Sequence, residues 1–150
     1  MSRRRSVLAL VVLCVAGCRN DGAQTTAPVN LASQQITDDT GAIQVDVGYR
    51  GAPEREVEIV VNLKAVGIEE MDKVVADIRV DGFVLVAGTP EWSGFVAPRQ
   101  PIAHKASFRL LEGNESGTLI VTVQRSANSE VLFETRLEFA ADGDRVKPVQ

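Results

Sequence analysis

Between residues 41 and 139, apolar and polar side chains alternate with a period of two. This period is typical of strands that bury one face and expose the other. Residues 83–87 differ, because they form a short run of consecutive apolar residues that ends at Gly88. The pattern predicts seven or eight strands, at residues 42–49, 56–65, 73–81, 83–87, 92–96, 102–110, 118–125 and 131–139.

The connections between these strands are short and contain turn residues such as Gly113, Asn114 and Gly117. A parallel sheet needs long crossover connections, and only residues 68–72 have the spacing of a single helical turn. The sequence therefore predicts an all-β fold, a two-sheet antiparallel sandwich of seven to eight strands.

The first 17 residues differ in character from this domain. Three arginines at positions 3–5 precede an apolar stretch at residues 7–15, and small residues follow it. The apolar stretch is about half the roughly 20 residues that a membrane-spanning helix needs. These features predict an export signal over residues 1–17. The only two cysteines, Cys14 and Cys18, lie at its end, so the domain downstream has no thiol or disulfide.

The segment Val15-Ala16-Gly17-Cys18 resembles the lipobox of bacterial lipoproteins. The resemblance implies that Cys18 is acylated after the signal is removed and that the chain is held by the membrane through this lipid anchor. Arg19 stands where an aspartate would favour the inner membrane, which implies the periplasmic leaflet of the outer membrane. An ordinary secretory signal that happens to end in cysteine is the alternative.

Polar segments flank the predicted domain at both ends. Residues 18–40 are rich in polar and small residues and include Pro28, which predicts a lipidated anchor and flexible tether. Residues 140–150 are again polar and predict a frayed tail. The expected domain therefore covers residues 41–139.

The stretch from Ile78 to Gly88, followed by Trp92-Ser93-Gly94-Phe95-Val96-Ala97-Pro98, resembles bacterial immunoglobulin-like modules of the adaptin-appendage and surface-repeat kind. The resemblance implies an immunoglobulin-like sandwich and supplies no functional residues. Arg99 departs from the pattern, because such modules often have a turn glycine there.

The chain carries 16 basic and 20 acidic side chains. Removal of residues 1–17, with three arginines and no acid, would leave 13 basic side chains against 20 acidic ones. This balance argues against a nucleic-acid partner.

The sequence predicts no enzyme and no cofactor, because its single histidine, His104, has no accompanying catalytic motif. The alternation places His104 on an apolar face, where a hydrogen-bonded histidine at the sandwich rim is expected. A ligand or catalytic role is the alternative.

Several groups of acidic side chains could bind a cation or a basic partner. Glu54, Glu56 and Glu58 would project from one strand face and could hold a basic partner or calcium, although a solvated outer face is the expectation. Glu69-Glu70-Asp72 and Asp142-Gly143-Asp144 lack the spacing of a calcium loop, so solvated turns and no metal site are expected.

Four apolar residues stand where a solvated sheet would carry polar ones, at Val60, Val75, Ile120 and Leu132. If neighbouring strands align them, they form a patch for a protein partner. The sequence thus predicts an accessory or structural module that binds another envelope protein, through this patch or by strand addition at an open sheet edge. The alternative is a small-ligand or glycan module that uses Trp92.

Overall fold

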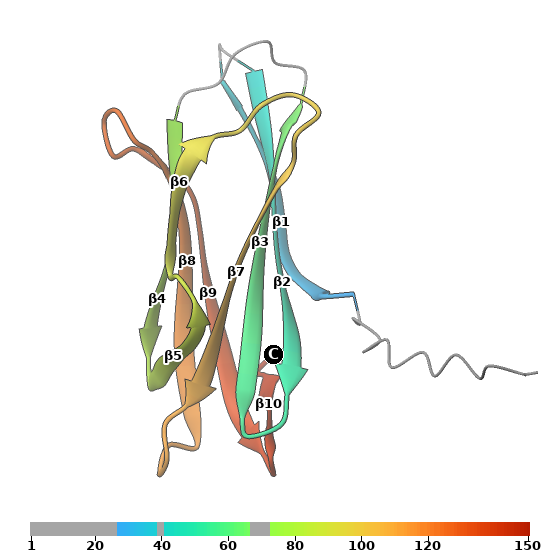
Figure 1. The fold of residues 1–150 in the computed structure, drawn as a ribbon, viewed down its shortest axis with the longest axis vertical. Helices are drawn as coiled ribbons and strands as arrows, with labels where there is room; N and C mark the ends of the chain where they lie inside the picture. The colour runs from blue at the N-terminus through green and yellow to red at the C-terminus, as the bar shows by residue number, and fades with distance from the viewer. Residues whose placement is uncertain (1–26, 39–40, 67–72) are drawn as a thin grey trace, which may run out of the picture.

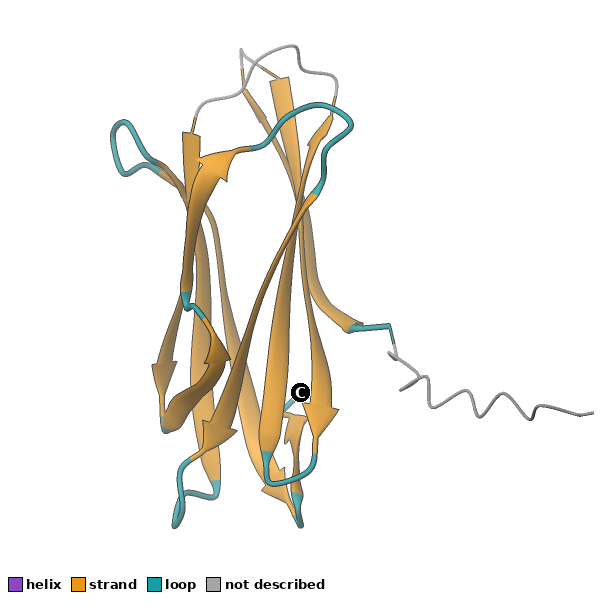
Figure 2. Cartoon of the chain, in the orientation of Figure 1, coloured by secondary structure: helices purple, strands orange, loops and turns teal. Residues whose placement is uncertain are grey.

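The computed structural model describes residues 27–38, 41–66 and 73–150. The described part consists of strands and loops only (Figure 2). The predicted signal, Cys18 and the expected helical turn at residues 68–72 lie outside the described residues. None of the described residues belongs to a helix that is long and apolar enough to cross a membrane.

Ten strands form two five-stranded antiparallel sheets that pack face to face (Figure 1). Sheet A has the order β1 (Val29–Asp38), β2 (Gly41–Ala52), β3 (Glu56–Val66), β7 (Ile102–Leu110) and β5 (Phe83–Gly88). Sheet B has the order β10 (Arg145–Pro148), β9 (Val131–Asp142), β8 (Ser116–Arg125), β4 (Lys73–Asp81) and β6 (Glu91–Phe95). The predicted all-β, two-sheet antiparallel sandwich is confirmed.

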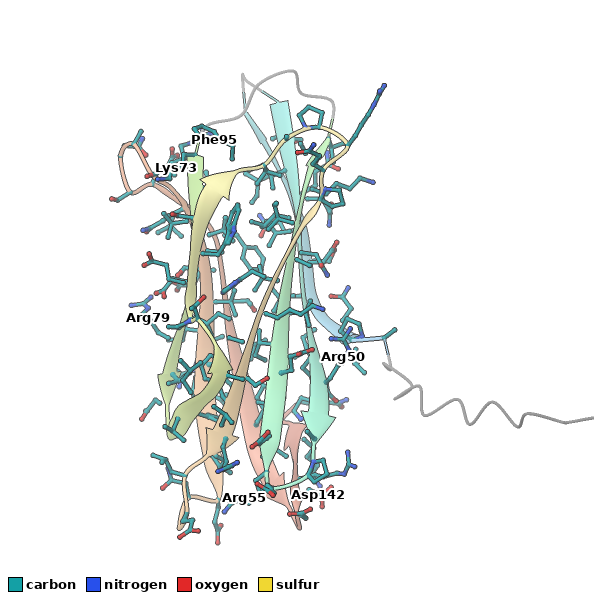
Figure 3. All side chains as sticks on the ribbon, in the orientation of Figure 1. Arg50, Arg55, Lys73, Arg79, Phe95 and Asp142 are labelled. Atoms are coloured by element: carbon teal, nitrogen blue, oxygen red, sulfur yellow. The ribbon has the colours of Figure 1, made fainter. Side chains whose placement is uncertain are left out.

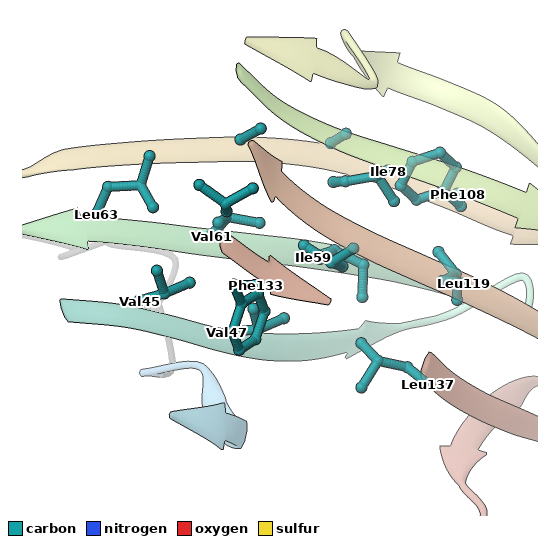
Figure 4. Packing of buried hydrophobic residues seen from close by; sticks show 14 of the residues in the cluster. Val45, Val47, Ile59, Val61, Leu63, Ile78, Phe108, Leu119, Phe133 and Leu137 are labelled. Atoms are coloured by element: carbon teal, nitrogen blue, oxygen red, sulfur yellow. The ribbon is translucent and has the colours of Figure 1, made fainter. Parts of the chain in front are cut away.

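The core lies between the two sheets and is built from the inward-facing residue of each alternating pair (Figure 4). Fully burying one such side chain contributes about 1.5–3 kcal/mol, so this layer dominates the stability of the domain. The largest side chains that are almost completely buried include Phe108, Phe139, Ile59, Leu63, Leu110 and Leu119.

The strand boundaries agree with the alternation most closely in the middle of the chain. Strands β4 and β7 have the predicted bounds, and β3 is one residue longer than expected. The number of strands differs, because the described residues form ten strands where seven or eight were expected.

One additional strand, β1, lies within residues 18–40, where we predicted a flexible tether. It pairs with β2 along nearly its whole length, and Leu31, Ala32 and Ile36 pack against the core. Its outer face is polar because β1 is an edge strand, and this polarity hid the period in the sequence. On that face, Gln44 Nε2 donates to Ser33 Oγ over 2.8 Å, and Ser33 donates to Asp46.

The other additional strand, β10, lies within the expected tail, and β9 also extends beyond residue 139. A turn at Gly143 folds β10 back against β9, so that Val146 is only 5% exposed. Burial of this one side chain holds the otherwise polar segment to the sandwich.

The chain changes sheets between β5 and β6, which follow one another with only Thr89 and Pro90 between them. β5 pairs with β7 in sheet A, whereas β6 pairs with β4 in sheet B (Figure 1). Gly88 makes the change possible: its φ is +78°, and an added β-carbon would lie 2.6 Å from the carbonyl oxygen of Lys105. β5 is therefore an edge strand of sheet A.

Candidate functional site

Exposed large apolar side chains gather where β4 turns into β5. Ten such residues occur in the described part of the chain, and five of them belong to this region. Leu111 joins the group because its backbone N–H donates to the carbonyl of Gly82 over 2.9 Å. We call these five residues the β5 edge cluster; they are Val80, Val84, Leu85, Val86 and Leu111, each 37–45% exposed.

The sequence of β5 explains the cluster. Phe83 points inward and is buried, but the four residues after it are all exposed. A register shift at Val86 breaks the pairing with β7 and leaves this valine without a directly opposite residue. This run was predicted as a short apolar strand, and the structure shows that the strand forms an edge of sheet A.

The backbone of β5 presents unpaired groups on its free side. Because Leu111 donates to Gly82, Phe83 and Leu110 form a non-hydrogen-bonded pair of the antiparallel ladder. The N–H and C=O groups of Phe83 and Leu85 therefore point away from β7. The described residues provide no backbone partner for them.

Strand β4 also has a free stretch next to β5. Its pairing with β6 ends at Asp77, and the N–H of Ile78 donates to the carbonyl of Pro90 over 2.9 Å. Beyond that point, β4 has a described partner only on its β8 side. Two free edges, one from each sheet, thus lie on the same side of the sandwich.

The other sheet edges differ from β5 because each carries polar or charged side chains. β1 has the network of Ser33, Gln44 and Asp46 with its neighbour β2. In sheet B, the edge strand β6 carries Glu91, and the edge strand β10 carries Arg145 and Lys147. Such groups discourage edge-to-edge pairing. β5 has no charged residue, so this protection is absent from its own side chains.

The structure does not bring together the four residues predicted to form an apolar patch. Val60 lies on β3 in sheet A and is 2% exposed, so it offers no surface. Leu132 packs against the core, at a register shift of β9. Sequence alternation could not reveal that these residues belong to different sheets.

Only Val75 and Ile120 remain on one face, the outer face of sheet B. They are separated by a polar row, because Asp77 lies opposite Thr122, whose hydroxyl donates to the Asp77 carbonyl over 3.5 Å. Arg79 adds ion pairs beside this row and is seen projecting from the sheet in Figure 3. The face therefore carries no continuous apolar patch.

Trp92 is partly buried and packs against the core from β6. Its ring lies over Gly94, where an added β-carbon would be 2.8 Å from the indole. This packing occupies the ring and explains the glycine two residues later. Nothing in this arrangement favours stacking of the ring on a sugar.

His104 lies on the inward face of β7, opposite Val61, and is 6% exposed. Its placement on an apolar face is as predicted. The expected hydrogen bond is missing for Nε2, which is buried and has no partner among the described residues. No second catalytic side chain contacts this nitrogen, so the geometry provides no acid–base pair.

The three glutamates predicted to share one strand face are neutralised by arginines. Glu54 lies in the β2–β3 turn, and Arg109 on β7 donates to both Glu54 and Glu56. The hydrogen bond to Glu56 raises the pKa of Arg109 above its ordinary value, and the charges of Glu56 and Glu54 act in the same direction. Glu58 pairs with Arg50 across the β2–β3 ladder. The group is an ion-pair ladder with no open carboxylate site.

The acidic turn at residues 142–144 is likewise engaged with its neighbours. Asp144 Oδ1 accepts the N–H of Glu54 over 3.0 Å, and Asp142 lies 3.7 Å from Lys147 Nζ. Arg55 and Asp142 lie at the same end of the sandwich, opposite the end with Phe95 (Figure 3). Residues 69–72 fall outside the described residues. In the ranges that are described, no three His, Cys, Asp or Glu side chains are grouped to hold a metal ion.

Hollows at this end of the sandwich have volumes of about 320–380 Å³. The one beside the ion-pair ladder is lined by charges of both signs, from Glu54, Arg55, Arg109 and Asp144. Of these, Glu54 and Arg109 form an ion pair, whereas Arg55 donates to the carbonyl of Asn114 and Asp144 accepts the N–H of Glu54.

Comparison with known proteins does not assign this chain to a family. No protein-family model matches this chain, and no curated protein is similar enough to show a relationship.

Proposed function

We propose that this protein is a lipid-anchored envelope lipoprotein with an immunoglobulin-like sandwich, held at the periplasmic leaflet of the outer membrane. It works by binding another envelope protein and not by catalysis. The lipobox resemblance at Val15-Ala16-Gly17-Cys18 supports the anchor. The observation that carries the binding function is the uncharged, apolar β5 edge cluster.

The position of the cluster suits an anchored protein. β1 and β5 are the two opposite edges of sheet A (Figure 1). With about 4.8 Å between neighbouring strands, the two edges are roughly 19 Å apart. The chain enters the domain at β1, so an anchor at Cys18 would hold the edge opposite to the cluster and leave β5 accessible.

The reach of the domain follows from the bounds of β1. Ten residues, 19–28, separate Cys18 from the first strand. Fully extended, they span at most about 35 Å. The partner that we propose is therefore a protein in the membrane or close to its surface.

Two measurements test the proposal. Metabolic labelling with a fatty acid should mark the native chain and a Cys14→Ser variant, and it should not mark Cys18→Ser. A photo-crosslinking residue at Val84 should yield one discrete crosslinked species in intact cells, and the same residue at Val131 should not. Both valines are exposed, at 45% and 54%, so Val131 is a matched control. Equal crosslinking from the two positions would contradict a specific edge.

A further inference from the structure

The unpaired backbone groups of β5 suggest which kind of partner segment the edge takes. We infer that the β5 edge cluster binds an extended segment of a partner protein, uncharged over about six residues and apolar at alternate positions, as a sixth strand of sheet A. This inference rests on the proposed binding function and specifies its geometry.

The first argument comes from hydrogen bonding. Phe83 and Leu85 direct N–H and C=O groups toward the free side of β5, two residues apart. An added strand meets such groups with its own alternate N–H and C=O groups, and this pairing is how extended peptides join sheet edges. A helix or a folded surface could not satisfy both residues in the same way.

The second argument comes from the side chains. Leu85 alternates with Phe83 on the inward side yet is 40% exposed, and Val80 on the facing sheet is 37% exposed. A strand beside β5 would place alternate side chains over Leu85 and Val80 and would cover the core on this side. Since β5 has no charged residue, an uncharged apolar segment is complementary to it, and a charged one would lose hydration without gaining a partner.

The third argument concerns a second copy of this chain. The six residues of β5 are about 20 Å long, and two packed sheets with their side chains are about 20 Å thick. Two copies meeting along this edge would bury roughly 800 Å² in total, below the 1,200 Å² or more of stable interfaces. The register shift at Val86 also disturbs a straight edge-to-edge pairing. A single segment can instead pair with β5 and place its inward side chains over Val80 of the facing sheet.

The experiment uses the purified chain and three six-residue peptides that alternate Val–Thr, Ile–Ser or Leu–Thr, each with a neutral solubilising tail. Amide nitrogens are methylated in turn along a peptide that binds. Alternate methylations should weaken binding at least tenfold because they remove donors that face β5, and the intervening ones should change it less than twofold. Leu85→Lys should abolish binding, whereas the matched Val131→Lys should not.

Failure of all three peptides to bind, or methylation effects without alternation, would overturn the inference. So would a dimer in sedimentation equilibrium that Leu85→Lys dissociates, because the occupant would then be a second copy. These results are distinct from failure of the proposed function, which is measured by crosslinking from Val84 in cells. A specific crosslink without peptide binding would leave the function in place and reject strand addition.

Discussion

The ring of Phe83 lies directly against the backbone of Gly117, so that an added β-carbon would be 2.5 Å from the ring. This contact joins β5 of sheet A to β8 of sheet B at the end of the sandwich that carries the β5 edge cluster. Phe83 is the residue that holds β5 to the core, since it is only 5% exposed whereas the residues after it in β5 are exposed.

Gly117→Ala should therefore destabilise the domain by about 1–3 kcal/mol, the usual cost of overpacking a core. The free energy of unfolding in urea measures the effect. Gly51→Ala is the control, because a β-carbon there meets its nearest atom at 3.9 Å, which is an ordinary contact. If both variants unfold at the same urea concentration, Phe83 is not packed against Gly117.

Arg99 adopts a φ of +63° in the turn from Ala97 to Gln100. With Pro98 before it, the turn has the form of type II, whose third residue is normally glycine. Arg99→Gly should stabilise the domain by about 0.5–1 kcal/mol, since the left-handed conformation strains an arginine. Thermal unfolding measures the change, and Ala97→Gly should lower stability. Loss of stability in Arg99→Gly would show that the arginine side chain matters more than its backbone.

His104 buries Nε2 without a partner, and an unsatisfied buried polar atom costs about 1–3 kcal/mol. His104→Leu should therefore raise the free energy of unfolding by about 1 kcal/mol, since leucine has a similar volume and no polar atom to satisfy. His104→Gln should not, because it keeps polar atoms in the same place. A clear destabilisation by leucine would indicate a hydrogen bond or a ligand that satisfies the ring in solution.

The hydrogen bond to Glu56 raises the pKa of Arg109 above its ordinary value, and an arginine is already charged at neutral pH without this shift. A raised pKa means that its contribution to stability is complete below the ordinary arginine value and is lost only above it, so no loss is expected between pH 5 and 9. Arg109→Gln should lower the urea midpoint slightly, and about 1 M NaCl should remove the difference from the native chain. A difference that persists in salt would argue against an electrostatic contribution.

The alternation of side chains was sufficient to predict the sandwich, because a period of two fixes which face of a strand is buried. Strands β4 and β7 followed this rule closely. β1 was missed because an edge strand with a polar outer face looks like a tether until Leu31 and Ile36 are seen to pack on the core.

The sequence predicted the type of candidate site but not its location. An open sheet edge was one of two surfaces expected from the sequence, but the pattern does not show which sheet a strand joins. Val60 and Ile120 were grouped for this reason, although they lie in different sheets. The signal that would have found the site was the run at residues 83–87, in which exposed apolar residues take the place of alternation.

The pairing of β1 at the edge of sheet A determines how the domain responds to force. A pull between the entry at Val29 and a partner held at β5 acts across the strands, so the hydrogen bonds from Val29–Tyr49 onward are loaded one after another. Bonds loaded in this order open like a zipper at low force. β1 would separate from β2 first, which would lengthen the segment between Cys18 and the domain while the remaining sandwich stays folded.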